Sequence, residues 1–267
     1  MLTAIVKRRW WLVVMLAACG RVDFADRDAN LDSNASGDGG APTAGLVGWW
    51  KLDEASGTIA ADSSGNDNTG TLSGGPTWVA GEIDGALSFG GDAADQFVDV
   101  PDASSLQLPG SWAVATWVKL SALPAAAAYD SLVAKSTAGG FANYNLLVDN
   151  GHVNAGIGWM IAYNGNGVGP CGIANAESPT PPSLGTWTHV ASVYDATAQT
   201  LTLYENGAAV ATSDETNCAP AHTGGGEDLT LGTEYGGGVT MLDGSLDDVR
   251  IYNRALSADE VVRVMTP

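Results

Sequence analysis

One stretch of the sequence concentrates side chains that could do chemistry. Residues 62–70, DSSGNDNTG, carry carboxylates, amides and hydroxyls around a glycine, between two segments that have the pattern of strands. Asp and Asn side chains close turns by accepting hydrogen bonds from the backbone two residues on. The same oxygens are also good ligands for a hard cation. The sequence therefore leaves two possibilities for this loop, a turn closed by its own side chains or a binding loop.

The motifs of the common hydrolases are missing. No serine has glycine two residues before and two residues after it, which the nucleophile elbow requires. His152, His189 and His222 are far apart in sequence, and none lies in an HExxH zinc motif. No strand-like run carries the alternating carboxylates with which a sandwich glucanase supplies nucleophile and acid. We therefore expect a non-catalytic protein, although acids from different strands could still meet.

Aromatic side chains offer another means of ligand recognition. Tyr144, Trp159, Tyr163 and Tyr235 lie near segments rich in glycine and asparagine, where they could stack on sugar rings. The competing interpretation is that these rings only cover the edges of the fold. Tryptophans in alternating apolar runs are expected in the core, and Trp78 is ambiguous.

The first residues have the pattern of an export signal. A basic stretch precedes the apolar run from Trp10 to Ala18, which is too short to span a bilayer. The run ends in LAAC, residues 16–19, which resembles the bacterial lipoprotein cleavage box. We therefore expect residues 1–18 to be removed and Cys19 to be lipidated. Gly20 resembles the residue that permits transport to the outer membrane in diderm bacteria. The alternative is an ordinary signal peptide in which Cys19 is incidental.

The cysteine count fits an exported lipoprotein. Lipidation would occupy Cys19 and leave Cys171 and Cys218, which an oxidising compartment favours as a disulfide. Such a bridge would stabilise the fold by roughly 3–4 kcal/mol. The alternatives are two free thiols or half of a metal site.

The chain is strongly acidic, with 11 basic and 30 acidic residues and a formal charge of −19. Loss of residues 1–18 would remove three of those 11 cations and no acid, which lowers the charge to −22. This charge excludes nucleic acid as a partner. It also repels anionic membrane surfaces, so we expect contact with a membrane through the lipid anchor only.

Two regions of different composition follow the signal. Residues 19–44 are acidic and rich in Gly, Asn and Ser, which predicts a flexible tether. Residues 45–267 consist of short alternating runs separated by turn residues, which is typical of a single all-β sandwich.

Local signals define three elements within this sandwich. Asn150-Gly151 and Asn206-Gly207 each lie between apolar runs and predict type I′ hairpin turns. Ser257 and Glu260 form a capping box before apolar residues, which predicts a helix over residues 257–265. We expect this helix to close the sandwich.

Four segments together resemble the laminin-G-like jelly-roll domain of the concanavalin A-like lectin/glucanase superfamily. They are LVGWWKLDEASGTIAADSSGNDNTGTL (46–72), GALSFGG (85–91), TWTHVASVYDATAQTLTLYENGAAV (186–210) and GSLDDVRIYNRALSADEV (244–261). The resemblance implies an all-β fold with two antiparallel sheets and a short C-terminal helix. It also implies that the first and last strands pair, and that calcium binds near the seam between them, as in many members.

This resemblance makes the opening loop a candidate calcium site. Asp62, Asn66 and Asn68 would supply oxygens from the loop, and Asp247 would supply another from the far end of the chain. Ca²⁺ takes six to eight oxygen ligands and tolerates irregular geometry. Only one of two adjacent acids on a strand faces a given side, so Asp248 is the substitute for Asp247. The alternative is still a turn closed by its own hydrogen bonds.

Taken together, the sequence predicts a non-catalytic binding module of the cell envelope, with calcium as a structural ion. Its expected partner is a glycan or another extracellular polymer. One alternative is a polysaccharide hydrolase of the same superfamily whose carboxylates come from different strands. The other is a structural surface lipoprotein that binds an extracellular protein.

Overall fold

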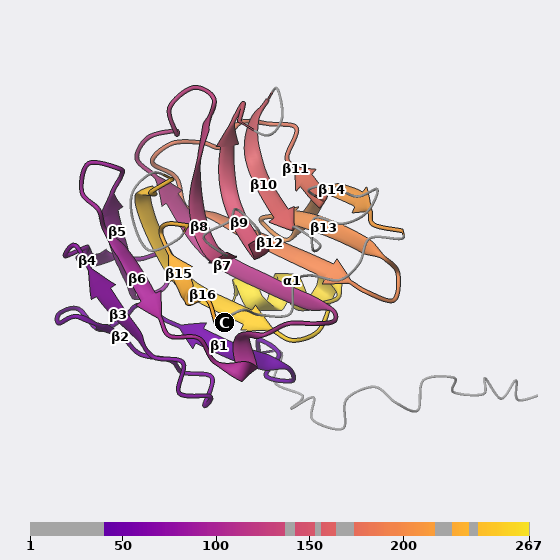
Figure 1. Ribbon diagram of the computed structural model, residues 1–267, viewed down its shortest axis with the longest axis horizontal. Coiled ribbons are helices and arrows are strands. Elements are labelled where there is room, and N and C mark those ends of the chain that lie inside the picture. The colour runs from indigo at the N-terminus through magenta and orange to yellow at the C-terminus, as the bar shows by residue number, and fades with distance from the viewer. Residues whose placement is uncertain are drawn as a thin grey trace, which may run out of the picture. The chain divides into compact units, whose positions relative to one another are not determined.

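The protein is a sandwich of two antiparallel β-sheets with one short helix near its carboxyl end (Figure 1). The structure, a computed structural model, describes residues 40–136, 142–152, 156–163, 174–216, 226–234 and 240–266. The two sheets enclose a common apolar core, which confirms the predicted all-β jelly-roll sandwich.

The first sheet contains the first and last strands of the domain. Its strands are β1 (Leu46–Trp50), β4 (Thr77–Ala80), β5 (Gly85–Gly90), β7 (Trp112–Leu120), β12 (Thr188–Asp195), β13 (Thr200–Glu205), β14 (Ala208–Asp214) and β16 (Asp243–Tyr252). They follow the order β14-β13-β12-β7-β16-β5-β4, and β1 pairs with β16.

The second sheet faces the first across the core. Its strands are β2 (Ile59–Ala60), β3 (Gly70–Ser73), β6 (Phe97–Val100), β8 (Ala128–Ser136), β9 (Ala142–Asn150), β10 (Ile157–Tyr163), β11 (Ala174–Glu177) and β15 (Leu229–Leu231). They follow the order β11-β10-β9-β8-β15-β6-β3-β2. A 3₁₀ turn, η1 (Ser104–Leu106), lies between β6 and β7.

Strand β16 joins the two ends of the chain. One edge of β16 pairs with β7, and the other edge is shared by two partners. Asp243–Leu246 pairs with β5, and Val249–Tyr252 pairs with β1. The predicted pairing of first and last strands is therefore confirmed. Between the two partners the register shifts, and Asp248 adopts a positive φ of 50°.

Side chains alternate along β7, so the first sheet packs against the core on one face and against the helix on the other. Val114 and Val118 point into the core between the sheets, whereas Ala113 and Ala115 belong to a second apolar cluster on the outer face. These small residues leave room for the helix to lie close to the sheet.

The helix, α1 (Ala258–Met265), begins as the sequence predicts. Ser257 accepts a hydrogen bond from the Glu260 backbone, and the Glu260 side chain accepts one from the Ser257 backbone. Val261 and Val264 are buried in the outer cluster with the alanines of β7. The helix therefore covers the outer face of the first sheet.

One of the two predicted type I′ turns is correct. Asn206 and Gly207 have φ values of 48° and 79°, and they join β13 to β14. The hairpin predicted at Asn150-Gly151 is present, since β9 and β10 pair antiparallel. Asn150 pairs with Ile157, however, so residues 151–156 connect the two strands and the predicted two-residue turn is wrong. The Asn150 side chain donates to the Pro124 carbonyl at 2.7 Å, which is a long-range contact that the local sequence does not reveal.

The packed domain begins slightly before residue 45. Tyr252 donates its hydroxyl proton to the Pro42 carbonyl at 3.0 Å, and Arg254 donates to the Ala44 carbonyl at 2.8 Å. Within the part of the chain that the structure describes, no helix is long and apolar enough to cross a membrane.

Candidate functional site

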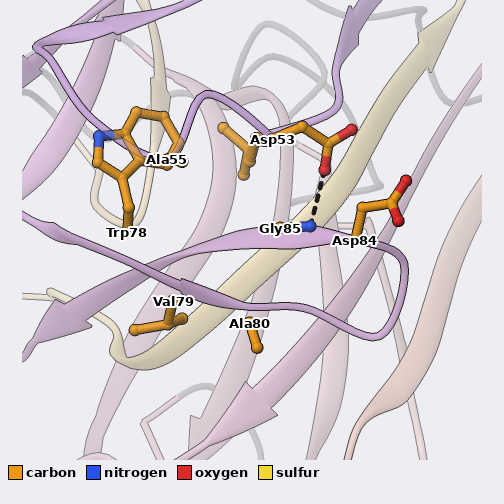
Figure 2. A pocket seen from close by; sticks show the side chains of 8 residues that line it. Asp53, Ala55, Trp78, Val79, Ala80, Asp84 and Gly85 are labelled. Carbon is orange, nitrogen blue, oxygen red and sulfur yellow. Dashed lines mark hydrogen bonds between the residues drawn. The ribbon is translucent and has the colours of Figure 1, made fainter.

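Among the described residues, one candidate site is a groove at the junction where β1 ends and β5 begins. Its volume is about 550 Å³. The lining comes from the segment after β1, from β4, and from the turn that leads into β5, and it comprises Leu52, Asp53, Ala55, Trp78, Val79, Ala80, Asp84 and Gly85. Figure 2 shows Trp78 at one end of the groove, and Asp53 and Asp84 near Gly85 at the other.

The chain approaches itself closely at the polar end of the groove. Gly85 donates its amide proton to Asp53 Oδ1 at 2.8 Å. A Cβ atom at Gly85 would lie 2.9 Å from both the Asp53 Cα and the Leu52 carbonyl oxygen. Glycine is therefore required at this position, and the hydrogen bond holds the two walls of the groove together.

Three of the ten described non-glycine residues with a positive φ line the groove. Leu52, Ala55 and Asp84 have φ values of 62°, 60° and 53°, which lie in the left-handed region that non-glycine residues rarely adopt. Leu52 is also fully buried, so its side chain fixes the strained backbone. Strained residues of this kind cost about 1–3 kcal/mol each and cluster at ligand-binding sites. The strained residues support the groove as a candidate site.

Trp78 supplies the apolar surface of the groove. Its ring is partly buried against the core, and its Nε1 donates to the Gly57 carbonyl at 3.1 Å. Other partly exposed tryptophans are engaged differently. The Trp49 ring has Lys51 Nζ and the Arg250 guanidinium carbon each 4.5 Å from its centroid, and the Trp187 ring has Lys119 Nζ at 4.8 Å.

A buried aspartate holds the β4–β5 turn beside the groove. Asp247 Oδ2 accepts hydrogen bonds from the amides of Glu82 and Ile83 at 2.9 and 2.8 Å. Burial raises the pKa of the Asp247 carboxyl to about 7; the charges of Asp248 and Asp53 raise it too, while the two amide donors lower it. Asp247 therefore serves to position the turn that carries Asp84.

Three of the four predicted calcium ligands lie together in the 62–70 loop, where protein hydrogen bonds engage them. Asp62 accepts hydrogen bonds from the amides of Trp49, Ser64 and Asn68 and from the Ser64 hydroxyl, all at 2.8–2.9 Å. Asn66 and Asn68 donate to the carbonyls of Leu46 and Val47, at 3.4 and 2.7 Å.

Asp247 makes its contacts on the β4–β5 turn instead. Within the described ranges, no group of three or more His, Cys, Asp or Glu side chains could hold a metal ion. The contacts of Asp62, Asn66, Asn68 and Asp247 thus fit the turn alternative better than one shared ion, and calcium binding stays a prediction.

The hydrogen bonds of Asp62 predict how this loop responds to mutation and to chelation. Asp62→Ala should lower the free energy of unfolding by about 2 kcal/mol, because three amides and a hydroxyl lose a charged acceptor. The thermal unfolding midpoint of the wild type separates the two alternatives, because equal midpoints in calcium and in chelator fit the turn alone. A higher midpoint in calcium that is lost in Asp62→Ala would contradict the turn and support the ion.

Two of the four predicted sugar-stacking aromatics are in the core. Tyr144 and Trp159 are each only 1% exposed. Tyr144 lies on the same face of β9 as Leu146 and Val148, and its hydroxyl donates to the Leu106 carbonyl at 3.2 Å. Rings without accessible faces cannot stack on a sugar, so this prediction is corrected for both residues.

Several other predictions fall outside the described residues. Cys19, Cys171, Cys218 and Tyr235 lie there, and so does the side chain of Tyr163. Lipidation, the disulfide and the roles of these two tyrosines therefore stay predictions.

The sequence did not reveal the groove itself. No local motif marks Asp53, and Trp78 was ambiguous between core and surface. The Asp84-Gly85 pair is a local signal for a turn, but its partner Asp53 is more than thirty residues away in sequence. Only the pairing of β5 and β1 along the same edge of β16 brings these residues together.

Comparison with known families agrees with the architecture. A family model described as the concanavalin A-like lectin/glucanases superfamily matches residues 90–262. The chain belongs to this superfamily. The groove residues, 52–85, precede the matched segment, so the groove lies in the part of the domain that the superfamily model does not cover.

Solved structures of the same fold come from several kinds of protein. Domain 4 of AbnA, a GH43 extracellular arabinanase from Geobacillus stearothermophilus, in complex with arabinotriose, is 20% identical with a TM-score of 0.62, and the match covers 83% of this chain and 98% of that domain. The binding domain of Paraclostridial Mosquitocidal Protein 1 is 16% identical with a TM-score of 0.62, over 82% and 51% of the two chains.

A third structure, Trypanosoma rangeli sialidase in complex with the inhibitor DANA, is 17% identical with a TM-score of 0.59, over 84% of this chain and 33% of the sialidase. The chain thus spans about half of the mosquitocidal binding domain and a third of the sialidase. At these identities the likeness shows the fold alone. No curated protein sequence matches the chain.

Proposed function

We propose that the protein is a non-catalytic carbohydrate-binding module of the cell envelope, and that the groove beside Trp78 receives the sugar. The observation that carries this proposal is the combination of an indole ring and two exposed carboxylates in a cavity whose walls are fixed by strained backbone.

The chemistry of the groove suits a saccharide. A sugar ring has an apolar C–H face that can stack on an indole, and hydroxyl groups around its edge that donate hydrogen bonds. Asp53 and Asp84 are exposed acceptors at the end opposite Trp78 (Figure 2). Carboxylates form stronger hydrogen bonds with hydroxyls than neutral acceptors do. A groove with an apolar wall and a few placed polar groups is typical of ligand sites.

The rigidity of the groove supports a binding role. The Gly85 amide is bonded to Asp53, and the β4–β5 turn is bonded to Asp247, so both walls are in place before a ligand arrives. A pre-formed site loses less entropy when it binds a ligand. The arabinotriose complex of AbnA domain 4 supports the choice of a saccharide by analogy, since the two domains share a fold.

The location of the module rests on the sequence. The lipoprotein-like box at Cys19 and the acidic segment up to residue 44 support a domain tethered to the envelope, with the outer membrane as its expected site.

A polysaccharide hydrolase is the second candidate, because two carboxylates line the groove. A glycosidase needs one carboxyl that its surroundings keep protonated and another that stays ionised. Asp53 and Asp84 are both exposed to solvent, and Asp53 already accepts the Gly85 amide. Binding therefore explains the groove better. Release of reducing ends that is lost in the Asp53→Asn and Asp84→Asn variants would establish the hydrolase instead.

The proposal is tested with residues 19–267 carrying Cys19→Ser, applied to a glycan array and then titrated with the glycans that bind. Trp78→Ala should weaken binding by about 30-fold, because an aromatic anchor commonly contributes about 2 kcal/mol. Trp187→Ala is the matched control, since Trp187 is also partly exposed but contacts Lys119 outside the groove. Equal affinity of wild type and Trp78→Ala would show that the groove is not the site.

A further inference from the structure

The groove carries a charge pattern that restricts its ligand further. Among the eight described residues that line it, Asp53 and Asp84 are acidic and none is basic. Both carboxylates lie at the same end, because Asp53 bonds to the amide of the residue after Asp84. The chain as a whole has a formal charge of −19, so no long-range positive field offsets this local charge.

Two basic residues lie near the groove residues, Lys51 in sequence and Arg250 on the strand β16 that pairs with β5. Both contact other groups of the protein. Lys51, two residues before Asp53, has its Nζ 4.5 Å from the centroid of the Trp49 ring. Arg250 lies against the same ring and forms an ion pair with Asp248 at 2.9 Å. With 2% of its side chain exposed, Arg250 cannot turn toward a ligand without breaking this buried pair.

A further carboxylate lies behind the turn. Asp247 is fully buried, its Oδ2 accepts two amides of the turn that carries Asp84, and its Oδ1 has no hydrogen-bond partner. The charge of Asp53 opposes the ionisation of Asp247, which places the two carboxyls within electrostatic reach of each other. An anion at the polar end of the groove would oppose the ionisation of Asp247 further.

We infer that the groove selects saccharides that carry no negative charge, and that it excludes uronates, sialosides and sulfated sugars. Neutral hydroxyls donate to Asp53 and Asp84, and a protonated amino group on the sugar would bind them more strongly. A carboxylate or sulfate on the ligand would face two like charges with no basic partner in the lining. This inference rests on the proposed function, and it names the class of glycan that the same site accepts.

Titration with trisaccharides that differ in charge tests the inference. The probes are galactotriose, trigalacturonate, cellotriose and the glucosamine trimer, each added to residues 19–267 with Cys19→Ser by calorimetry at pH 6. We expect trigalacturonate to bind at least about 10-fold more weakly than galactotriose at low salt, and this ratio to shrink in about 0.5 M salt. The glucosamine trimer should bind at least as tightly as cellotriose.

The double variant Asp53→Asn/Asp84→Asn separates charge from shape. Asparagine keeps an oxygen for the Gly85 amide and tolerates the positive φ at position 84, so the groove should survive. In this variant the two galactose-type trimers should bind with nearly equal affinity. If trigalacturonate binds the wild type as tightly as galactotriose does, the inference is overturned while the proposed function stands. The same holds if the preference for galactotriose over trigalacturonate persists in the double variant. A protein that binds no trimer and no array glycan contradicts the proposed function itself.

Discussion

Replacement of Asp248 by alanine is expected to lower the free energy of unfolding by about 3–5 kcal/mol. Asp248 and Arg250 form an ion pair at 2.9 Å with side chains only 6% and 2% exposed. Asp248 also accepts a hydrogen bond from Trp49 Nε1. Its removal leaves a buried guanidinium without its counterion, and alanine is less suited than aspartate to the positive φ at this position.

The double variant Asp248→Ala/Arg250→Met is the control for this prediction. Methionine keeps an apolar chain against the Trp49 ring and removes the unpaired charge, so the double variant should recover most of the lost stability. Urea unfolding of the wild type and the two variants gives the comparison. A loss below about 1 kcal/mol in the single variant, the range of an exposed ion pair, would contradict the buried pair.

Trp50→Ala is expected to cost about 3–5 kcal/mol as well, by a different mechanism. Trp50 is fully buried in the core, on the strand that joins the start of the chain to β16. Its Nε1 donates to the Asn68 carbonyl at 2.8 Å, which ties the core to the 62–70 loop. Truncation would leave a cavity in the core and an unpaired carbonyl in the loop.

Trp50→Phe separates these two contributions. Phenylalanine retains much of the ring volume and loses the hydrogen bond, so the expected cost is about 1–2 kcal/mol. Thermal and urea unfolding monitored by far-UV circular dichroism measures both variants. A Trp50→Ala variant as stable as the wild type would show that β1 is not part of the cooperative core.

Much of the fold was predictable because its signals are local. The capping box of Ser257 and Glu260 starts the helix, and Asn206-Gly207 forms the hairpin turn that its left-handed preference predicts. The alternation of apolar residues also identified most of the strands. The same alternation places Tyr144 on the face of Leu146 and Val148, so the pattern already contained the evidence that this ring is buried.

The candidate site was not predictable because it depends on a register shift. The local sequence does not show that β16 changes partners at Asp247 and Asp248, or that Asp247 faces the β4–β5 turn rather than the 62–70 loop. The positive φ of Leu52 has no signal in the sequence either, since leucine favours other conformations. The two-residue turn predicted at Asn150-Gly151 is wrong for a related reason, because the strand pairing of Asn150 with Ile157 overrides the local turn preference.

The central claim is that the groove at the β1–β5 junction holds a glycan. A crystal structure with the tightest-binding trisaccharide tests this claim most directly. The account predicts a sugar ring stacked on the Trp78 indole, with hydroxyls donating to Asp53 and Asp84. The alternative is a site elsewhere on the protein surface. A trisaccharide bound there, with the groove beside Trp78 empty, would contradict the account.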